Sequence, residues 1–179
     1  MKRSAAFLGL ALALTSLPAS GQTNQMDEAL DISRLLLEAP AGVDLAYGAF
    51  QRGFYLTALE LAMPRAQNED AVAQTLIAEI YANGLGVPQD MTRAIEWYTR
   101  ADANGDVQAS FQLALIYQDG QGVTRDRARA AELFTRAAEG GHLAARYNLG
   151  LLHVEGVYAE PNLVRAATLI GEAAEAGLP

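Results

Sequence analysis

The chain has 179 residues with 21 acidic and 13 basic side chains, a formal net charge of −8 and no cysteine. The absence of cysteine excludes disulfides, thiolate metal sites and a cysteine nucleophile. The negative charge, with no basic run, argues against nucleic acid and anionic membrane surfaces as binding partners.

Residues 1–21 have the pattern of a secretory signal peptide. Two basic residues precede an apolar run from Ala5 to Leu14, which is shorter than the about 20 residues that a membrane-spanning helix needs. The small residues Ala19 and Gly21 lie at the −3 and −1 positions of a cleavage site before Gln22. We therefore expect export to the periplasm, with no membrane insertion after signal cleavage.

Residues 22–42 are predicted to form a linker and a capping helix, because a leucine-rich face in this segment precedes a proline. Residues 43–70 are predicted to form a degenerate first helical repeat. Ala58 lies 36 positions before Ala94 of the regular repeat that follows, and the Arg52-Gly53 sequence provides a short turn.

A repeat of 36 residues occupies 71–106, 107–142 and 143–179, and we expect it to continue beyond the chain end. The first two copies agree without a gap at Tyr81 and Tyr117, Gly84 and Gly120, Gly86 and Gly122, Val87 and Val123, Asp90 and Asp126, Ala94 and Ala130, and Ala101 and Ala137. Agreement in register over this length is typical of a protein built from stacked helical repeats.

Each copy predicts two helices. The first helices cover 72–83, 108–119 and 144–155, and the second helices cover 91–103, 127–139 and 163–176. The predicted caps are Asp90, Asp126 and Asn162 before the second helices, and Gly84, Gly120 and Gly156 after the first helices. Small residues such as Ala78, Ala114 and Gly150 let the paired helices approach closely. Because such a unit cannot bury its apolar faces alone, consecutive units are expected to stack.

Motifs that could indicate catalysis have simpler structural explanations. The Gly84-Leu85-Gly86 sequence lies between helices, without the strand or the lysine of a phosphate-binding loop. His142 and His153 are the two histidines of the chain, and neither has the spacing of a metal ligand. We expect His142 to be a solvated turn residue and His153 to pack in the core. The sequence predicts no enzyme activity, no cofactor and no metal site.

Charged residues gather at several helix ends. The carboxylates of Asp70, Asp102 and Asp106 are expected to be solvated there. The one dense group, Arg125-Asp126-Arg127-Ala128-Arg129, has two interpretations. It is either an exposed first turn with local ion pairs or a docking patch for an acidic loop of a partner.

The repeated pattern carries a family resemblance. It reads Ala-x-x-x-Leu-(Ala/Gly)-x-x-Tyr-x-x-Gly-x-Gly-Val-x-x-Asp-x-x-x-Ala-x-x-(Trp/Leu)-(Tyr/Phe)-x-x-Ala, and its three copies extend from Ala71 to Leu178. The pattern resembles the Sel-one-like repeat, a relative of the tetratricopeptide repeat. The resemblance implies an all-α fold, a right-handed alpha-alpha solenoid of stacked antiparallel helix pairs.

Exported proteins of the family that the chain resembles include regulators of envelope signalling and of exopolysaccharide production. The resemblance therefore implies a periplasmic protein-protein interaction module, an adaptor or regulator of such an envelope process. The alternative is a cell-wall-active protein or enzyme that binds peptidoglycan or β-lactams. Relatives with that property carry a disulfide in every repeat, whereas this chain has no cysteine.

A protein or peptide partner is expected on the concave face of the solenoid, which the first helices line. Positions that differ between the copies make up this predicted surface: Gln74, Ser110 and Arg146; Leu76, Gln112 and Asn148; and Glu79, Leu115 and Leu151. The mixture of polar and apolar groups suits an extended peptide or a partner helix.

The C-terminal end of the stack is a second candidate interface. Its last helix carries apolar residues that we expect on two sides: Leu163, Ala166, Leu169, Ile170 and Ala173. An uncovered apolar face of this kind predicts either a further repeat or self-association of two chains through this end.

Overall fold

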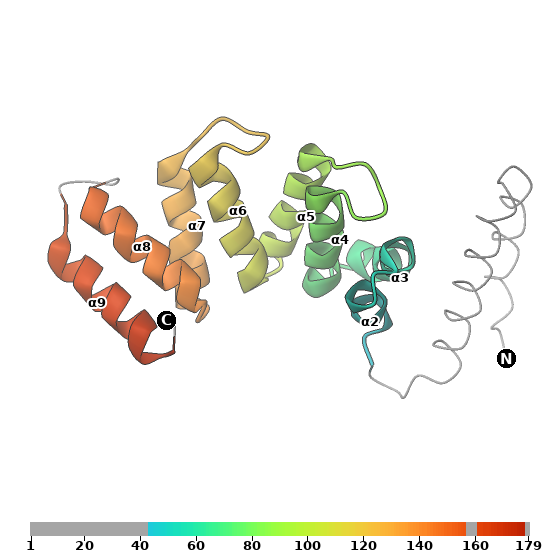
Figure 1. Ribbon diagram of the computed structural model, residues 1–179, viewed down its shortest axis with the longest axis horizontal. Helices are drawn as coiled ribbons and strands as arrows, with labels where there is room; N and C mark the ends of the chain where they lie inside the picture. Colours follow the sequence, from blue (N-terminus) through green and yellow to red (C-terminus); the bar gives the residue numbers. More distant parts are fainter. Residues whose placement is uncertain (1–42, 157–160, 178–179) are drawn as a thin grey trace, which may run out of the picture. The chain divides into compact units, whose positions relative to one another are not determined.

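We describe residues 43–156 and 161–177 of a computed structural model of the protein (Figure 1). The predicted signal peptide, residues 1–21, and the predicted linker and capping helix, residues 22–42, lie outside the described residues. The part of the chain from Ala46 onward forms one compact unit.

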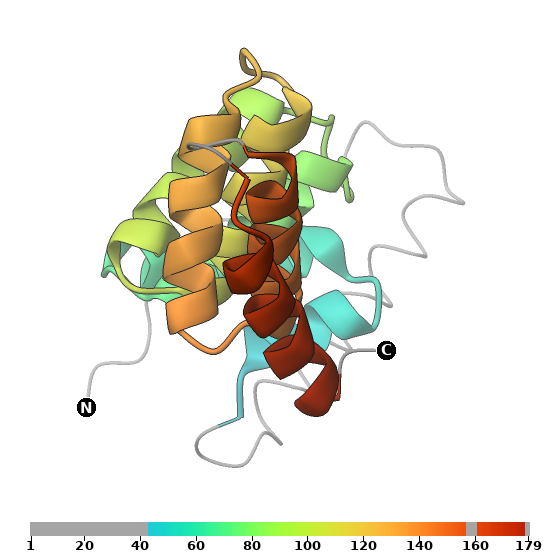
Figure 2. The same cartoon turned by 90° about the vertical axis from the view of Figure 1, so that its left-hand side faces the viewer.

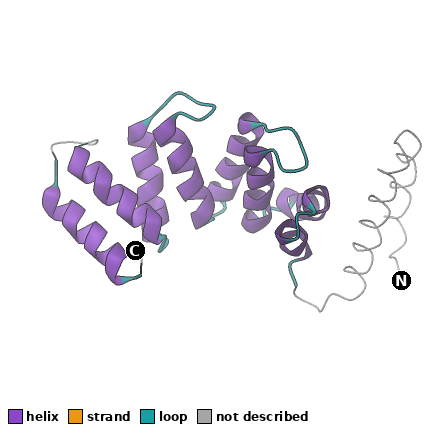
Figure 3. Cartoon of the chain, viewed as in Figure 1, coloured by secondary structure: helices purple, strands orange, loops and turns teal. Residues whose placement is uncertain are grey.

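The described residues form eight α-helices and no strand (Figure 3). These helices are α2 (Leu45–Gln51), α3 (Tyr55–Gln67), α4 (Ala71–Asn83), α5 (Met91–Ala103), α6 (Val107–Asp119), α7 (Arg127–Glu139), α8 (Leu143–Glu155) and α9 (Leu163–Glu175). The first helix of each repeat begins one residue earlier than predicted, and the last helix ends one residue earlier.

The helices pack in chain order as antiparallel pairs. The pairs are α4 with α5, α6 with α7 and α8 with α9, and contacts of α3 with α4, α5 with α6 and α7 with α8 join one pair to the next. The loops within pairs, 84–90 and 120–126, lie at one end of the helices, and the turns between pairs lie at the other end (Figure 1). Seen from the side of α9, successive pairs lie behind one another (Figure 2). This arrangement confirms the predicted all-α solenoid.

The helix caps follow the repeat. Asp90, Asp126 and Asn162 accept a hydrogen bond from the backbone N–H three residues later at 3.0, 2.9 and 2.9 Å, as predicted. Gly84, Gly120 and Gly156 end the first helices with φ of 64°, 74° and 66°, in the left-handed conformation that glycine adopts without strain.

The first helices have N-caps that the sequence pattern did not predict. Asp70 accepts from Ala73 N at 3.0 Å and Asp106 accepts from Ala109 N at 2.7 Å. Asp102 is paired with Arg136 and accepts a hydrogen bond from Ser110. The expectation that these three carboxylates are simply solvated was wrong, because each is held by a specific partner.

Small residues allow the close packing within each pair. Ala78 and Ala114 have no exposed surface. At the equivalent position of the third repeat, a Cβ on Gly150 would lie 2.7 Å from Ile170 Cγ1 and 3.2 Å from the Ala166 carbonyl oxygen. The prediction that Gly150 lets α8 approach α9 closely is therefore confirmed.

The last helix carries apolar residues on a buried and on an exposed side, in agreement with the prediction. Ala166, Leu169 and Ala173 are buried, whereas Leu163 and its neighbour Val164 are exposed. A further exposed apolar group lies on α8, where Tyr147, Leu151 and Val154 follow one face of the helix. Self-association through this end stays a prediction.

Candidate functional site

The predicted partner-binding residues all lie on the first helices, α4, α6 and α8. Six of them remain at least partly accessible: Glu79, Gln112, Leu115, Arg146, Asn148 and Leu151. Gln74 and Ser110 are each 2% exposed, and Leu76 is 5% exposed. These three cannot form an accessible surface for a partner, and that part of the prediction is corrected.

Gln74, Ser110 and Arg146 instead connect each first helix to the helix before it. The Gln74 amide donates to the Ala66 carbonyl at 2.9 Å. The Arg146 guanidinium lies 3.4 Å from the Ala138 carbonyl, at the same offset of eight residues. The Ser110 hydroxyl donates to the Asp102 carboxylate, again eight residues earlier. This repeat position therefore joins neighbouring repeats, which explains why it is polar.

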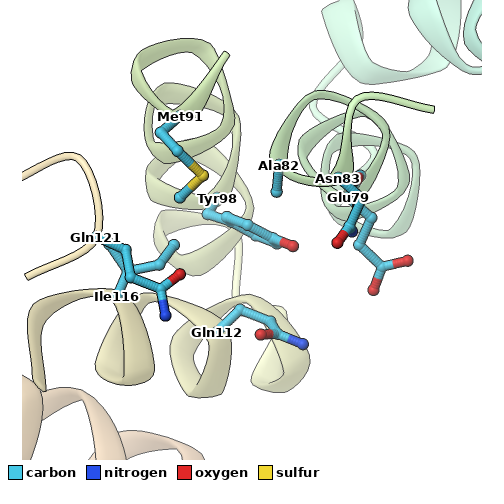
Figure 4. A pocket seen from close by; sticks show the side chains of 8 residues that line it. All are labelled: Glu79, Ala82, Asn83, Met91, Tyr98, Gln112, Ile116 and Gln121. Atoms are coloured by element: carbon cyan, nitrogen blue, oxygen red, sulfur yellow. Dashed lines mark hydrogen bonds between the residues drawn. The ribbon is translucent and has the colours of Figure 1, made fainter. Parts of the chain in front are cut away.

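A pocket of about 220 Å³ lies between α4, α5 and α6 (Figure 4). We call it the Tyr98 pocket. It is lined by Glu79, Ala82, Asn83, Met91, Tyr98, Gln112, Ile116 and Gln121. Two of the predicted partner-binding residues, Glu79 and Gln112, thus lie in one hollow that spans two repeats. Tyr98 reaches this hollow from α5, a helix that the prediction did not include.

The Tyr98 hydroxyl is available to a ligand. The Tyr98 side chain is only 3% exposed, and its hydroxyl makes no hydrogen bond with any described residue. Figure 4 shows the hydroxyl directed from α5 into the hollow beside Glu79 and Asn83. Burial, together with the negative charges of Glu79 and Asp106, raises the pKa of Tyr98 far above its usual range. The hydroxyl therefore stays protonated and can donate or accept a hydrogen bond.

Glu79 gives the pocket its charge. Burial is the main cause that raises the pKa of Glu79, and the nearby negative charge of Asp106 raises it further. Within the described part of the chain, no cation or hydrogen-bond donor pairs with the Glu79 carboxylate. A half-buried carboxylate without a partner is unfavourable in the free protein and attracts a cation.

The third repeat has a different surface. Leu151 is 37% exposed, and Tyr147 and Val154 are exposed on the same side of α8. The Asn148 amide donates to the Ala144 carbonyl at 2.7 Å within the helix. The polar and apolar groups of the predicted surface therefore lie in different repeats. A polar pocket lies between α4, α5 and α6, and an apolar stripe lies on α8.

The arginine cluster at the start of α7 is occupied by contacts within the chain. Arg125 Nε donates to the Gln118 carbonyl at 2.8 Å, and Arg127 forms an ion pair with Glu155. The Arg129 guanidinium lies 4.9 Å from the centre of the Tyr117 ring. These contacts favour the interpretation of this segment as an exposed first turn with local interactions.

Neither histidine lies in a metal-binding group. Within residues 43–156 and 161–177, no cluster of three or more His, Asp, Glu or Cys side chains could hold a metal ion. His142 is not a solvated turn residue as expected, because its imidazole caps α8 and stacks on Phe111. None of the described helices is long and apolar enough to cross a membrane.

The Sel1 repeat family model matches residues 71–106, 107–142 and 143–178. The three matches cover more than half of the sequence, and the chain belongs to this family of helical repeat proteins. The family assignment confirms the resemblance found in the sequence. A Sel1-repeat solenoid is typical of modules that bind other proteins.

Two solved structures are similar to this chain. The Sel1 repeat protein from Oxalobacter formigenes has a TM-score of 0.70 and 31% identity, over 74% of this chain and 54% of that chain. A protective antigen of uropathogenic Escherichia coli strains that displays an SLR fold has a TM-score of 0.66 and 22% identity, over 82% of this chain and 33% of that chain. The chain thus spans about half and about one third of these two structures. No curated protein sequence matches it.

Proposed function

We propose that the chain is a periplasmic adaptor that binds a protein partner along α4, α6 and α8, in the service of an envelope process such as signalling or exopolysaccharide production. The observation that carries the binding role is the Tyr98 pocket, where Glu79, Tyr98 and Gln112 present polar groups that no described residue uses. The signal-peptide pattern of residues 1–21 supports the compartment.

The proposed role is binding rather than catalysis. A catalytic site needs a nucleophile or a base in contact with a group that activates or orients it. Both ring nitrogens of His142 are already engaged, by Ala145 N and by Gln108 Oε1. A binding surface needs only accessible groups on a rigid scaffold, which the stacked helices provide.

Site-specific photo-cross-linking of the full chain in living cells tests the proposal. A photoreactive amino acid at Gln112 or at Leu151 should capture a partner, because both side chains are accessible on the first helices. The matched control is Glu132, an exposed residue of the second helix α7. A partner captured from position 132 but not from positions 112 and 151 would show that the interface lies on the second helices instead of the first helices.

The compartment has its own test. N-terminal sequencing of protein recovered from the periplasm should find Gln22 as the first residue. An intact Met1 in the membrane fraction would contradict export through a cleaved signal. A parallel assay with labelled penicillin tests the alternative of a cell-wall-active protein, and retention of the label would contradict the adaptor role.

A further inference from the structure

The Tyr98 pocket combines unused acceptors with one negative charge. The Asn83 amide nitrogen donates to the Glu79 backbone carbonyl at 2.9 Å, which leaves the Asn83 side-chain oxygen directed to other partners. The Gln112 side chain makes no hydrogen bond with any described residue. Together with the Glu79 carboxylate and the Tyr98 hydroxyl, these groups form a set of acceptors around one hollow (Figure 4).

The charge of the pocket is fixed by the fold. Asp106 is the N-cap of α6 and accepts from Ala109 N at 2.7 Å, so its carboxylate is held in place at the start of that helix. Asp106 lies close enough to Glu79 to disfavour a second negative charge there. With no cation of the described chain on Glu79, the most favourable ligand is one that brings a positive charge.

The size and the walls of the pocket select one side chain. A volume of about 220 Å³ is smaller than the roughly 300–1,000 Å³ of pockets for drug-sized ligands. Met91, Ile116 and the Tyr98 ring provide an apolar wall on which an aliphatic stem can pack. The polar end offers several acceptors at different angles, which match the planar guanidinium with its five N–H donors better than an ammonium.

We propose that the Tyr98 pocket binds an arginine side chain presented by the protein partner, with Glu79 as the residue that pairs with the guanidinium. This inference rests on the proposed adaptor function and names the chemistry of one contact within it. Tyr98 and Gln112 orient the guanidinium through hydrogen bonds, and the apolar wall holds the stem.

Titration of the full chain with small amides, followed by NMR, tests the inference. The probe is Nα-acetyl-arginine amide, and the matched control is Nα-acetyl-citrulline amide, which has nearly the same shape without the charge. The arginine probe should shift the signals of Tyr98 and of the Gln112 side-chain amide and bind at least tenfold more tightly than citrulline. Equal binding of citrulline, or of Nα-acetyl-lysine amide, would overturn the assignment to a guanidinium.

Two variants separate binding from folding. Glu79→Gln keeps the shape of the side chain and should lower the affinity for the arginine probe at least tenfold. Glu96→Gln, on the exposed side of α5, should leave the affinity for the probe unchanged. Glu79→Gln should also raise the melting temperature of the free protein, because it removes an unpaired charge beside Asp106. Tyr98→Phe keeps the packing and should weaken the probe severalfold. An arginine affinity that Glu79→Gln leaves unchanged would overturn the proposal.

Two experimental results separate the arginine-binding inference from the adaptor proposal. Cross-linking from positions 112 and 151 with no binding of the arginine probe would overturn the arginine pocket alone. Tight binding of the probe with no partner cross-linked from either position would overturn the adaptor function alone.

Discussion

His142 stacks on Phe111 across the boundary between two repeats, with ring centroids 4.1 Å apart and ring planes inclined by 21°. His142 Nδ1 accepts a hydrogen bond from Ala145 N at 3.1 Å, and Nε2 lies 3.1 Å from Gln108 Oε1. Because Nδ1 must accept, the neutral tautomer with its proton on Nε2 satisfies both contacts. A single imidazole thus caps α8 and fastens it to α6.

This geometry predicts a dependence of stability on pH. Burial lowers the pKa of His142 in the folded protein below its ordinary value of 6.5. The unfolded chain then binds a proton first as the pH falls. The contribution of His142 to stability is therefore fully present above about pH 6.5 and is lost between that value and the lower pKa of the folded state.

Urea unfolding at pH 8 and pH 5 measures the effect. The free energy of unfolding should fall over this interval in the wild type. His142→Asp introduces the cap residue that Asp70 and Asp106 provide in the other repeats, and it should show a smaller decrease over the same interval. An equal decrease in both proteins would show that another group causes it.

The second prediction concerns the contribution of the α7 N-cap to stability. Asp126 accepts from Arg129 N at 2.9 Å, and Asp126→Ala should lower the free energy of unfolding by about 0.5–2 kcal/mol because that first-turn N–H loses its partner. Glu132→Ala, an exposed change in the same helix, should stay within about 0.5 kcal/mol of the wild type. Similar effects of the two substitutions in chemical denaturation would contradict a specific capping role.

Glycine to alanine substitutions should change stability in opposite directions at two positions. Gly120 has a φ of 74°, and a Cβ there would lie 3.2 Å from Arg125 Cβ, so Gly120→Ala should destabilise by about 1 kcal/mol or more. Gly171 lies within α9, where an added Cβ would meet open space, so Gly171→Ala should stabilise by about 0.5–1 kcal/mol. Thermal unfolding of both variants compares the signs directly, and a matching sign would contradict the assigned conformations.

The sequence predicted the repeat and its helices because those depend on local signals. Asp90 and Gly84 recur at fixed intervals, and each acts on the backbone within four residues of itself. The rotation of each helix about its axis depends instead on packing across the pair. Gln74 shows the difference, because it is polar and variable like a surface residue but lies buried against the end of α3.

The Tyr98 pocket was only partly predictable for the same reason. Glu79 and Gln112 differ from their equivalents in the other copies, and this variation indicates a binding surface. Tyr98 lies on a buried stripe whose equivalent in the next repeat is Phe134, and this pattern predicts packing alone. The hydroxyl that distinguishes Tyr98 from Phe134 is the signal that could have indicated a polar site.

The close approach of α8 to α9 gives the last prediction. A Cβ on Gly150 would lie 2.7 Å from Ile170 Cγ1, nearer than side-chain carbons pack. Gly150→Leu should therefore destabilise by about 1–3 kcal/mol through overpacking. Gly150→Ala combines a gain of about 0.5–1 kcal/mol in helix stability with the clash against Ile170, and the clash should dominate.

A double-mutant cycle isolates that contact. Ile170→Ala removes Cγ1 and opens space beside position 150, but the Ala166 carbonyl oxygen, 3.2 Å from the added Cβ, remains. Gly150→Ala should therefore be less destabilising in the Ile170→Ala background than in the wild type. The coupling free energy between the two positions should be at least about 0.5 kcal/mol, as expected for residues in direct contact. Additive effects in urea unfolding would show that α8 and α9 separate enough to accept the methyl group, and that the glycine is not required for their packing.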